Sequence, residues 1–290
     1  FYTLMVLGTA LFGRPAFKHV IVNGLVQAED GQKMSKRLKN YPELEHVLDK
    51  YGADALRLYL TSSPVMRCED LNFSERGVEE VLKKIIQRLE NSLALYDLGR
   101  GDDQVAPSTA SDHVLDRWIV SRLYQLILEM EQSLEKYEVA RAVRPVGQFV
   151  DDFSAWYLRR SRDRFKGDDM VDRLNALGTT RYVLEEFSKA LAPIAPFIAE
   201  HLYQHMSVGE GAWKGSVHLA SWPTTGFIDE KLLGDMKIAR GIVEAALAAR
   251  QKAGIKVRQP LAALTTSLTL PPEFRSLIMD EVNVKKFISA

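Results

Sequence analysis

Four basic side chains stand within seven residues of an early polar segment, "QKMSKRLKN", at Lys33, Lys36, Arg37 and Lys39. Lysine carries a compact ammonium group on a flexible stem, and Gly31 just before the cluster allows the backbone to move. Such groups suit a negative charge that shifts during a reaction, as when a triphosphate is cut into a nucleotide and pyrophosphate. Lys33 and Lys36 are therefore candidate catalytic residues. The alternative is a solvated basic turn with Met34 tucked into the core.

The segment before this loop has the composition of a strand. Phe17–Val26, "FKHVIVNGLV", is rich in β-branched residues and predicts a strand buried on both faces of a parallel sheet. Asn23 and Gly24 would then lie near its carboxyl end, where open α/β sheets bind their ligands. Because Gly24 has no Cβ, a base or a phosphate could approach the backbone there. The other strands of such a nucleotide-binding layer would have to lie upstream of Phe1.

A second group of basic side chains lies in "YLRRSRDRFK", residues 157–166. The chain has 38 basic and 38 acidic residues, so any attraction for nucleic acid must come from local clusters of this kind. On a helix these side chains form a ridge that can neutralise RNA phosphates and stack on unpaired bases. The alternative is an exposed helix end whose cations pair with nearby aspartates and with the helix dipole. The candidate RNA-binding residues are Arg159, Arg160, Arg162, Arg164 and Lys166.

Hydrophobic periodicity predicts mostly helices around these two groups. Helices are expected over residues 1–12, 42–51, 53–61 and 75–98, and then over 112–136, 138–165, 170–191 and 194–207. The short connections in the second set favour a four-helix bundle. "SVHLASWP", residues 216–223, reads as a strand, and the tail as a helix over 229–252 followed by strand, short helix and strand. Asp54 and Arg57, three residues apart, are expected to support their own helix.

Composition excludes several classes of protein. A single cysteine, Cys68, rules out an internal disulfide framework and a multi-cysteine zinc site, and we expect no metal ligands in these residues. No apolar run approaches the roughly 20 residues needed to cross a bilayer, and the first residues lack the basic flank of a secretory signal. The expectation is a cytoplasmic protein with no membrane partner.

The segment around the first basic group resembles class I aminoacyl-tRNA synthetases. "KMSKR", residues 33–37, is similar to their lysine-methionine-serine-lysine-serine motif, and "VNGLVQAEDGQKMSKRLKNYP" with "YGADALRLYL" resembles the isoleucyl family, its eukaryote-like branch in particular. "WYLRRSRDRF", "SVHLASWP" and "AGIKVRQPL" are similar to the anticodon-binding region of that family. The resemblance implies a mainly α fold in four parts: the end of a Rossmann-like α/β catalytic domain (1–72), a connecting helical segment and linker (73–110), an anticodon-binding helical bundle (111–225), and a further helix with a small α/β tail (226–290).

The resemblance also implies roles for residues of the loop. Lys36 would contact ATP and stabilise the transition state at the α-phosphate, and Lys33 would assist at the leaving pyrophosphate. The backbone around Asn23, Gly24 and Met34 would border the adenine. The implied cofactors are ATP with Mg²⁺, and the implied reaction activates isoleucine and transfers it to tRNA(Ile). Members of the family are usually monomers.

Three departures from the family's pattern limit these implications. Neither the histidine-x-glycine-histidine ATP motif nor the inserted editing domain occurs in these residues, so the chain alone is expected not to form the adenylate. Arg37 stands where the commoner motif has serine, and it is given no catalytic role.

Other readings stay open. A valyl or leucyl synthetase fragment shares the fold and the loop but usually has "KSxGN" where this chain has "KRLKN", residues 36–40. A non-catalytic tRNA-binding helical module with a relic loop is a second alternative, and an unrelated adenylyltransferase with an appended bundle is a third.

Overall fold

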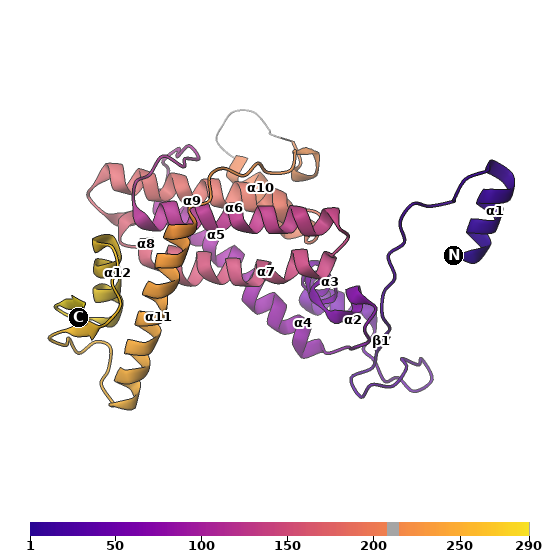
Figure 1. Cartoon of the computed structure of the whole chain (residues 1–290), viewed down its shortest axis with the longest axis horizontal. Coiled ribbons are helices and arrows are strands. Elements are labelled where there is room, and N and C mark those ends of the chain that lie inside the picture. Colours follow the sequence, from indigo (N-terminus) through magenta and orange to yellow (C-terminus); the bar gives the residue numbers. More distant parts are fainter. Residues whose placement is uncertain (208–214, 290) are drawn as a thin grey trace.

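A computed structural model describes residues 1–207 and 215–289. The chain is mainly α-helical, as the sequence predicts, with a long helical bundle, a small tail beside it, and an amino-terminal helix that stands apart from both (Figure 1). In the described ranges, no helix combines the length and the apolar character that crossing a membrane requires.

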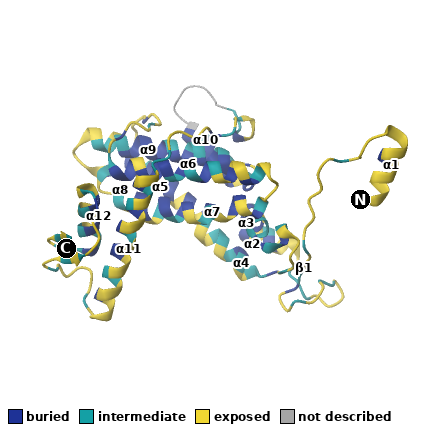
Figure 2. Ribbon diagram, viewed as in Figure 1, coloured by how far each residue is buried: buried dark blue, intermediate teal, exposed yellow. Residues whose placement is uncertain are grey.

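The amino-terminal part contains much less sheet than the sequence predicts. Helix α1 (Tyr2–Phe12) ends at Gly13, and residues 14–25 then run as an extended, largely exposed segment toward the rest of the molecule (Figures 1 and 2). The expected strand over 17–26 was wrong in extent, because only β1 (Val26–Gln27) is a strand. A strand buried on both faces needs neighbouring strands, and among the described residues β1 pairs, in parallel, with β2 (Leu71–Asn72) and with no other strand.

Short helices fill the crossover between β1 and β2. They are α2 (Leu44–Tyr51), α3 (Ala53–Ser62) and a 3-10 turn (Pro64–Arg67). Helix α4 (Glu75–Val81) then starts with Ser74, whose side chain accepts a hydrogen bond from the Gly77 N–H and so satisfies one free donor of the first turn. A π-helical turn (Leu82–Ile86) joins α4 to α5 (Gln87–Arg100).

The predicted bundle is present, with one helix broken into pieces. Its helices are α6 (Val114–Glu135), α7 (Val139–Asp151), α9 (Met170–Leu191) and α10 (Pro196–Ser207). The helix expected over 138–165 instead passes from α7 through a π-helical turn (Asp152–Leu158) into α8 (Arg159–Ser161) and a 3-10 turn (Arg164–Lys166). Figure 2 shows that the buried residues concentrate where these helices face one another.

Aromatic side chains form the centre of the bundle. Phe149, Phe153 and Tyr157 follow one another at four-residue spacing along α7 and the π-helical turn, and their rings stack at centroid distances of 6.3 and 5.9 Å. Phe187 of α9 meets Phe149 at 5.0 Å, and Trp118 of α6 is also fully buried. Ring pairs at these separations add stability beyond the area that they bury.

A buried carboxylate organises the polar part of this core. Asp116 is 1% exposed and accepts hydrogen bonds from the Tyr157 hydroxyl at 2.9 Å and the Ser111 hydroxyl at 2.6 Å. Arg164 donates to both oxygens of Asp116, each at 2.8 Å, and also to both oxygens of Asp172. Burial lowers the pKa of Arg164, but the hydrogen bonds with the two carboxylates outweigh burial and raise it. Arg164 therefore stays charged as part of the core.

Helix α3 fastens the amino-terminal part to the bundle. Asp54 Oδ2 accepts a hydrogen bond from the backbone N–H of Ile198 at 2.6 Å, in the first turn of α10. Arg57 donates from Nε to the carbonyl of Ile194 at 2.7 Å and from Nη2 to the carbonyl of Pro193 at 3.1 Å, just past the end of α9. The expectation that Asp54 and Arg57 support their own helix was wrong, because both reach the α9–α10 corner, more than 130 residues away.

The carboxyl-terminal tail is a helix followed by a small β–α–β unit. Helix α11 (Glu230–Lys252) lies against α6, and α12 (Pro272–Val282) crosses between the parallel strands β3 (Leu264–Thr266) and β4 (Phe287–Ser289). Buried Arg250 holds the intervening turn by donating to the carbonyls of Lys256, Gln259 and Asn283. The strand expected over 216–223 was wrong: Val217–Leu219 forms a 3-10 turn started by Ser216. It meets no neighbouring strand in the described residues.

The Asp116 network predicts a large difference between two neighbouring arginines. Arg164→Gln leaves Asp116 buried without its cation, which should lower the free energy of unfolding by about 3–5 kcal/mol. Arg162→Gln, at an exposed position in the same basic cluster, should change it by less than about 0.5 kcal/mol. Urea unfolding of the 290-residue chain followed by circular dichroism measures both. Equal stability of the two variants would contradict the structural role of Arg164.

Candidate nucleotide and RNA sites

The basic loop follows a tight turn at the end of β1. The Ala28 N–H donates to the Gln32 carbonyl at 2.8 Å, and Gly31 sits between them with φ of +78°, a backbone conformation that glycine adopts without strain. The Asp30 side chain accepts from the Gln32 N–H at 3.0 Å. The turn therefore fixes where the chain leaves β1 and where the basic loop begins, at Lys33.

Asn40 closes the loop at its base. Its Oδ1 accepts from the Ser35 N–H at 2.9 Å, and its Nδ2 donates to the Lys33 carbonyl at 3.2 Å. Ser35 also accepts backbone bonds from Leu38 and Lys39, and Lys39 turns the chain back with a φ of +47°. Asn40 was not among the predicted site residues, although a short amide side chain after a polar turn is a known signal for such backbone bonds.

One side of the loop faces an apolar cavity and the other faces solvent. Met34 lines a cavity of about 210 Å³ together with Val26, Tyr41, Pro42, Leu44, Val47, Leu56, Leu60 and Phe73. Lys33, Lys36 and Arg37 are exposed, whereas Met34 and Asn40 are half-buried. Neither Lys33 nor Lys36 has an ion pair or side-chain hydrogen bond to any described residue. Both ammonium groups are therefore available to an anionic ligand such as a polyphosphate.

Asn23 and Gly24 lie beside the segment that follows α3. The Gly24 N–H donates to the Val65 carbonyl at 2.8 Å, and a Cβ on Gly24 would come within 1.9 Å of the Glu69 carbonyl oxygen. Glycine is required here because the chain itself passes close by, which differs from the expected approach of a base or phosphate. Asn23 is exposed. The prediction that these two residues border a nucleotide stays a prediction.

Much of the basic cluster at 159–166 is engaged within the protein. Arg159 and Arg160 both form ion pairs with Glu281 of α12, and the side chain of Arg160 is only 8% exposed. Arg160 also lies over the Trp156 ring at 5.4 Å. Burial lowers the pKa of Arg160, and the charge of Glu281 counteracts it. These two arginines therefore hold the tail against the bundle.

The remaining members of that cluster differ in exposure. Arg164 is bound to Asp116 and Asp172, so an RNA contact would require breaking a buried network. Arg162 and Lys166 are exposed and have no ion pair with any residue in the described ranges. The structure thus separates the five candidate RNA-binding residues into three that bind carboxylates and two that are open to a ligand.

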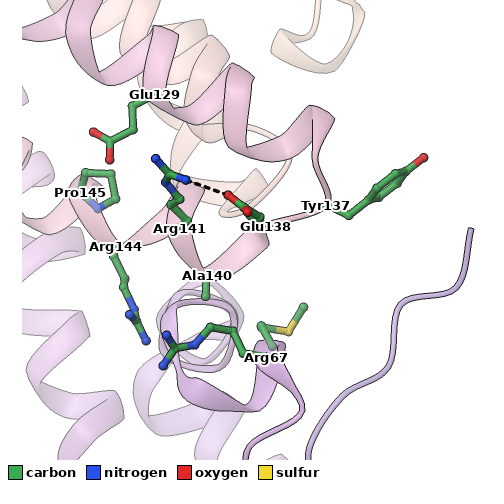
Figure 3. Close-up of a pocket in the computed structure, with 9 residues that line it drawn as sticks. Arg67, Glu129, Tyr137, Glu138, Ala140, Arg141, Arg144 and Pro145 are labelled. Carbon is green, nitrogen blue, oxygen red and sulfur yellow. Dashed lines mark hydrogen bonds and ion pairs between the residues drawn. The ribbon is translucent and has the colours of Figure 1, made fainter.

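A larger cleft, of about 750 Å³, lies between the 3-10 turn after α3 and the start of α7 (Figure 3). Its arginines all have partners. Arg141 donates to Glu138 at 3.1 Å, Arg144 donates to the Ser62 carbonyl at 3.1 Å, and Arg67 lies 3.4 Å from Glu69. Glu129 and Glu138 also line the cleft, so it lacks the uncompensated positive charge of the loop.

Metal ligands do not converge in residues 1–207 and 215–289: no group of three or more histidine, cysteine, aspartate or glutamate side chains could hold an ion there.

Two protein families match this chain. The family described as tRNA synthetases class I (I, L, M and V) matches residues 1–74, which include the loop. The family described as the anticodon-binding domain of tRNA ligase matches residues 116–265, which include the bundle and α11.

Two curated relatives match along nearly the whole chain. Isoleucine–tRNA ligases from Chlamydia muridarum and Protochlamydia amoebophila are 44% and 42% identical to it, each over 99% of its length. The chain spans 28% of the length of each of these two relatives.

A solved structure supports the fold alone. The leucyl-tRNA synthetase agnB2 LeuRS of Agrobacterium radiobacter K84, in a ternary complex with tRNA and LeuAMS, aligns with 80% of this chain and 27% of its own chain at a TM-score of 0.55 and 21% identity.

The match to the anticodon-binding domain covers residues 116–265, which are 150 of the 290 residues. The chain therefore belongs to the family of tRNA ligases that carry this domain.

Proposed function

We propose that this chain is the nucleotide-loop and tRNA-binding part of an isoleucine–tRNA ligase, which activates isoleucine with ATP and transfers it to tRNA(Ile). The observation that carries the proposal is the loop: two exposed lysines, unpaired among the described residues, on a turn closed by Asn40, in a chain whose bundle matches the anticodon-binding family. The relatives at 42–44% identity are isoleucine–tRNA ligases, which favours isoleucine over valine or leucine.

In this proposal the loop acts on the phosphates of ATP. Lys36 stabilises the charge that develops at the α-phosphate, and Lys33 assists the leaving pyrophosphate. The backbone near Asn23, Gly24 and Met34 borders the adenine. Mg²⁺ would arrive with ATP, held by phosphate oxygens, and would neutralise part of the remaining charge. Met34 in its apolar cavity and Asn40 at the loop base keep the two lysines on the solvent side.

The other parts of the proposal concern organisation and partners. Residues 1–72 belong to the catalytic domain, 73–110 connect it, 111–225 form the anticodon-binding bundle, and 226–290 form the tail. Arg162 and Lys166 contact tRNA phosphates, because they are the exposed members of the second basic cluster. The full-length ligase would be a cytoplasmic monomer.

Removing Lys36 tests the proposed chemistry. In the full-length ligase, Lys36→Ala should slow isoleucine-dependent ATP–pyrophosphate exchange by about 10²–10³-fold, because the transition state then lacks one preorganised cation. Arg37→Ala removes a charge from the same loop at a position without an assigned role, and it should change the rate by less than about threefold. Unaltered exchange in Lys36→Ala would contradict the assignment.

Removing the exposed cations of the second cluster tests RNA binding. The variant Arg162→Gln with Lys166→Gln should bind tRNA(Ile) more weakly, and the slope of log K against log salt should fall by about 1 for each phosphate that the protein no longer neutralises. Lys231→Gln, at an exposed position of α11, is the control and should leave the slope unchanged. Fluorescence anisotropy at several potassium chloride concentrations measures the binding constant and its salt slope. An unaltered slope in the double variant would contradict the proposal that Arg162 and Lys166 contact tRNA.

A further inference from the structure

We propose that Asp54 and Arg57 are positioning residues that hold the anticodon-binding bundle at a fixed place relative to the nucleotide loop, so that they are needed for transfer to tRNA and not for adenylate formation. This inference rests on the proposed function. It starts from a helix, α3, that contacts the loop region with one face and the bundle with another.

The acidic residue of the pair meets the start of α10. The first backbone N–H groups of a helix have no partner within it, and they carry the positive end of the helix dipole. Asp54 accepts from one of them, the Ile198 N–H, at 2.6 Å, and is 6% exposed. The cap on α10 is therefore supplied by a side chain from a helix 144 residues earlier in the chain.

The basic residue of the pair meets the other side of the same corner. The carbonyls of Pro193 and Ile194 lie in the turn between the end of α9 at Leu191 and the start of α10. Arg57 donates to both, at 3.1 and 2.7 Å. One turn of α3 thus presents a negative charge to the start of α10 and a positive charge to the carbonyls of the turn before it, and these two contacts constrain both the position and the direction of α3 on the corner.

A different face of α3 supports the loop. Leu56 and Leu60, four residues apart on α3, line the apolar cavity that Met34 also lines. Met34 lies between Lys33 and Ser35, the two residues whose backbones Asn40 bridges. A displacement of α3 on the bundle would therefore carry the loop along with it, so that the loop keeps its support but changes its place relative to the bundle.

This arrangement matters only for a ligand that contacts both regions at once. ATP and isoleucine would meet the loop and the catalytic domain, whereas a tRNA held by the bundle must also place its acceptor end beside the loop. A misplacement of about 1 Å can reduce a rate by as much as 10²-fold when two reacting groups must be aligned. Loosening α3 on the bundle should therefore affect the tRNA step selectively.

The test compares two reactions of the full-length ligase. Asp54→Ala and Arg57→Ala should leave isoleucine-dependent ATP–pyrophosphate exchange, which needs no tRNA, within about twofold of the unsubstituted enzyme. Each should lower kcat/KM for charging of tRNA(Ile) by about tenfold or more. Asp54→Asn keeps an oxygen that can accept from Ile198, and it should restore most of the charging activity.

A cap within the bundle supplies the control. Asp169 accepts from the N–H groups of Val171 and Asp172 at the start of α9, so Asp169→Ala removes a helix cap without touching α3. It should leave the ratio of charging to exchange unchanged. Normal charging in both Asp54→Ala and Arg57→Ala, or an equal fall of charging and exchange, would overturn the inference. The proposed function would fail separately, if the unsubstituted ligase showed no isoleucine-dependent exchange.

Discussion

The contact between α3 and the α9–α10 corner is the constraint on which the arrangement of this molecule depends. Without it, the loop-bearing segment would be joined to the bundle through α4, α5 and the packing of α3 on α7. A charge-assisted hydrogen bond that is shielded from water, as that of buried Asp54 is, is worth about 1.5–3 kcal/mol, whereas the hydrogen bonds of the exposed Arg57 are weakened by solvent. The second oxygen of Asp54 is buried and has no hydrogen-bond partner among the described residues, which costs part of that gain. The pair therefore contributes more to geometry than to net stability.

Buried charge also explains why the basic cluster at 159–166 is not simply an RNA-binding ridge. Arg164 neutralises Asp116 in the core. Arg159 and Arg160 both pair with Glu281 and so hold the carboxyl-terminal tail against the bundle. In the basic loop the opposite holds: Asn40 and Met34 take up the inward positions, and Lys33 and Lys36 remain outside without partners in the described residues. Cations that pair with carboxylates within the protein stabilise the fold, whereas exposed cations without a partner in the described residues are free to bind phosphates.

Local signals in the sequence predict the helices and the loop well. The apolar periodicity of α6, α9 and α11 and the residues of the basic loop are properties of neighbouring residues, and the structure has these helices close to the predicted bounds. The strand over 17–26 failed because burial on both faces depends on strands that the described chain does not supply. The close approach at Gly24 could not be predicted for a related reason, since the backbone that approaches it belongs to Glu69, 45 residues later. Asp54 and Arg57 have helical i, i+3 spacing, and nothing local shows that their partners lie in another helix pair.

A distance measurement across the α3 contact tests the central claim directly. With the exposed Cys68 replaced by serine, spin labels at Glu45→Cys on α2 and Glu131→Cys on α6 report how the loop-bearing part sits on the bundle. Pulsed electron–electron double resonance on the 290-residue chain should show one narrow distance distribution, and the combined Asp54→Ala and Arg57→Ala substitutions should broaden it. A broad distribution before substitution, or an unchanged narrow one after it, would contradict the positioning role of these two side chains.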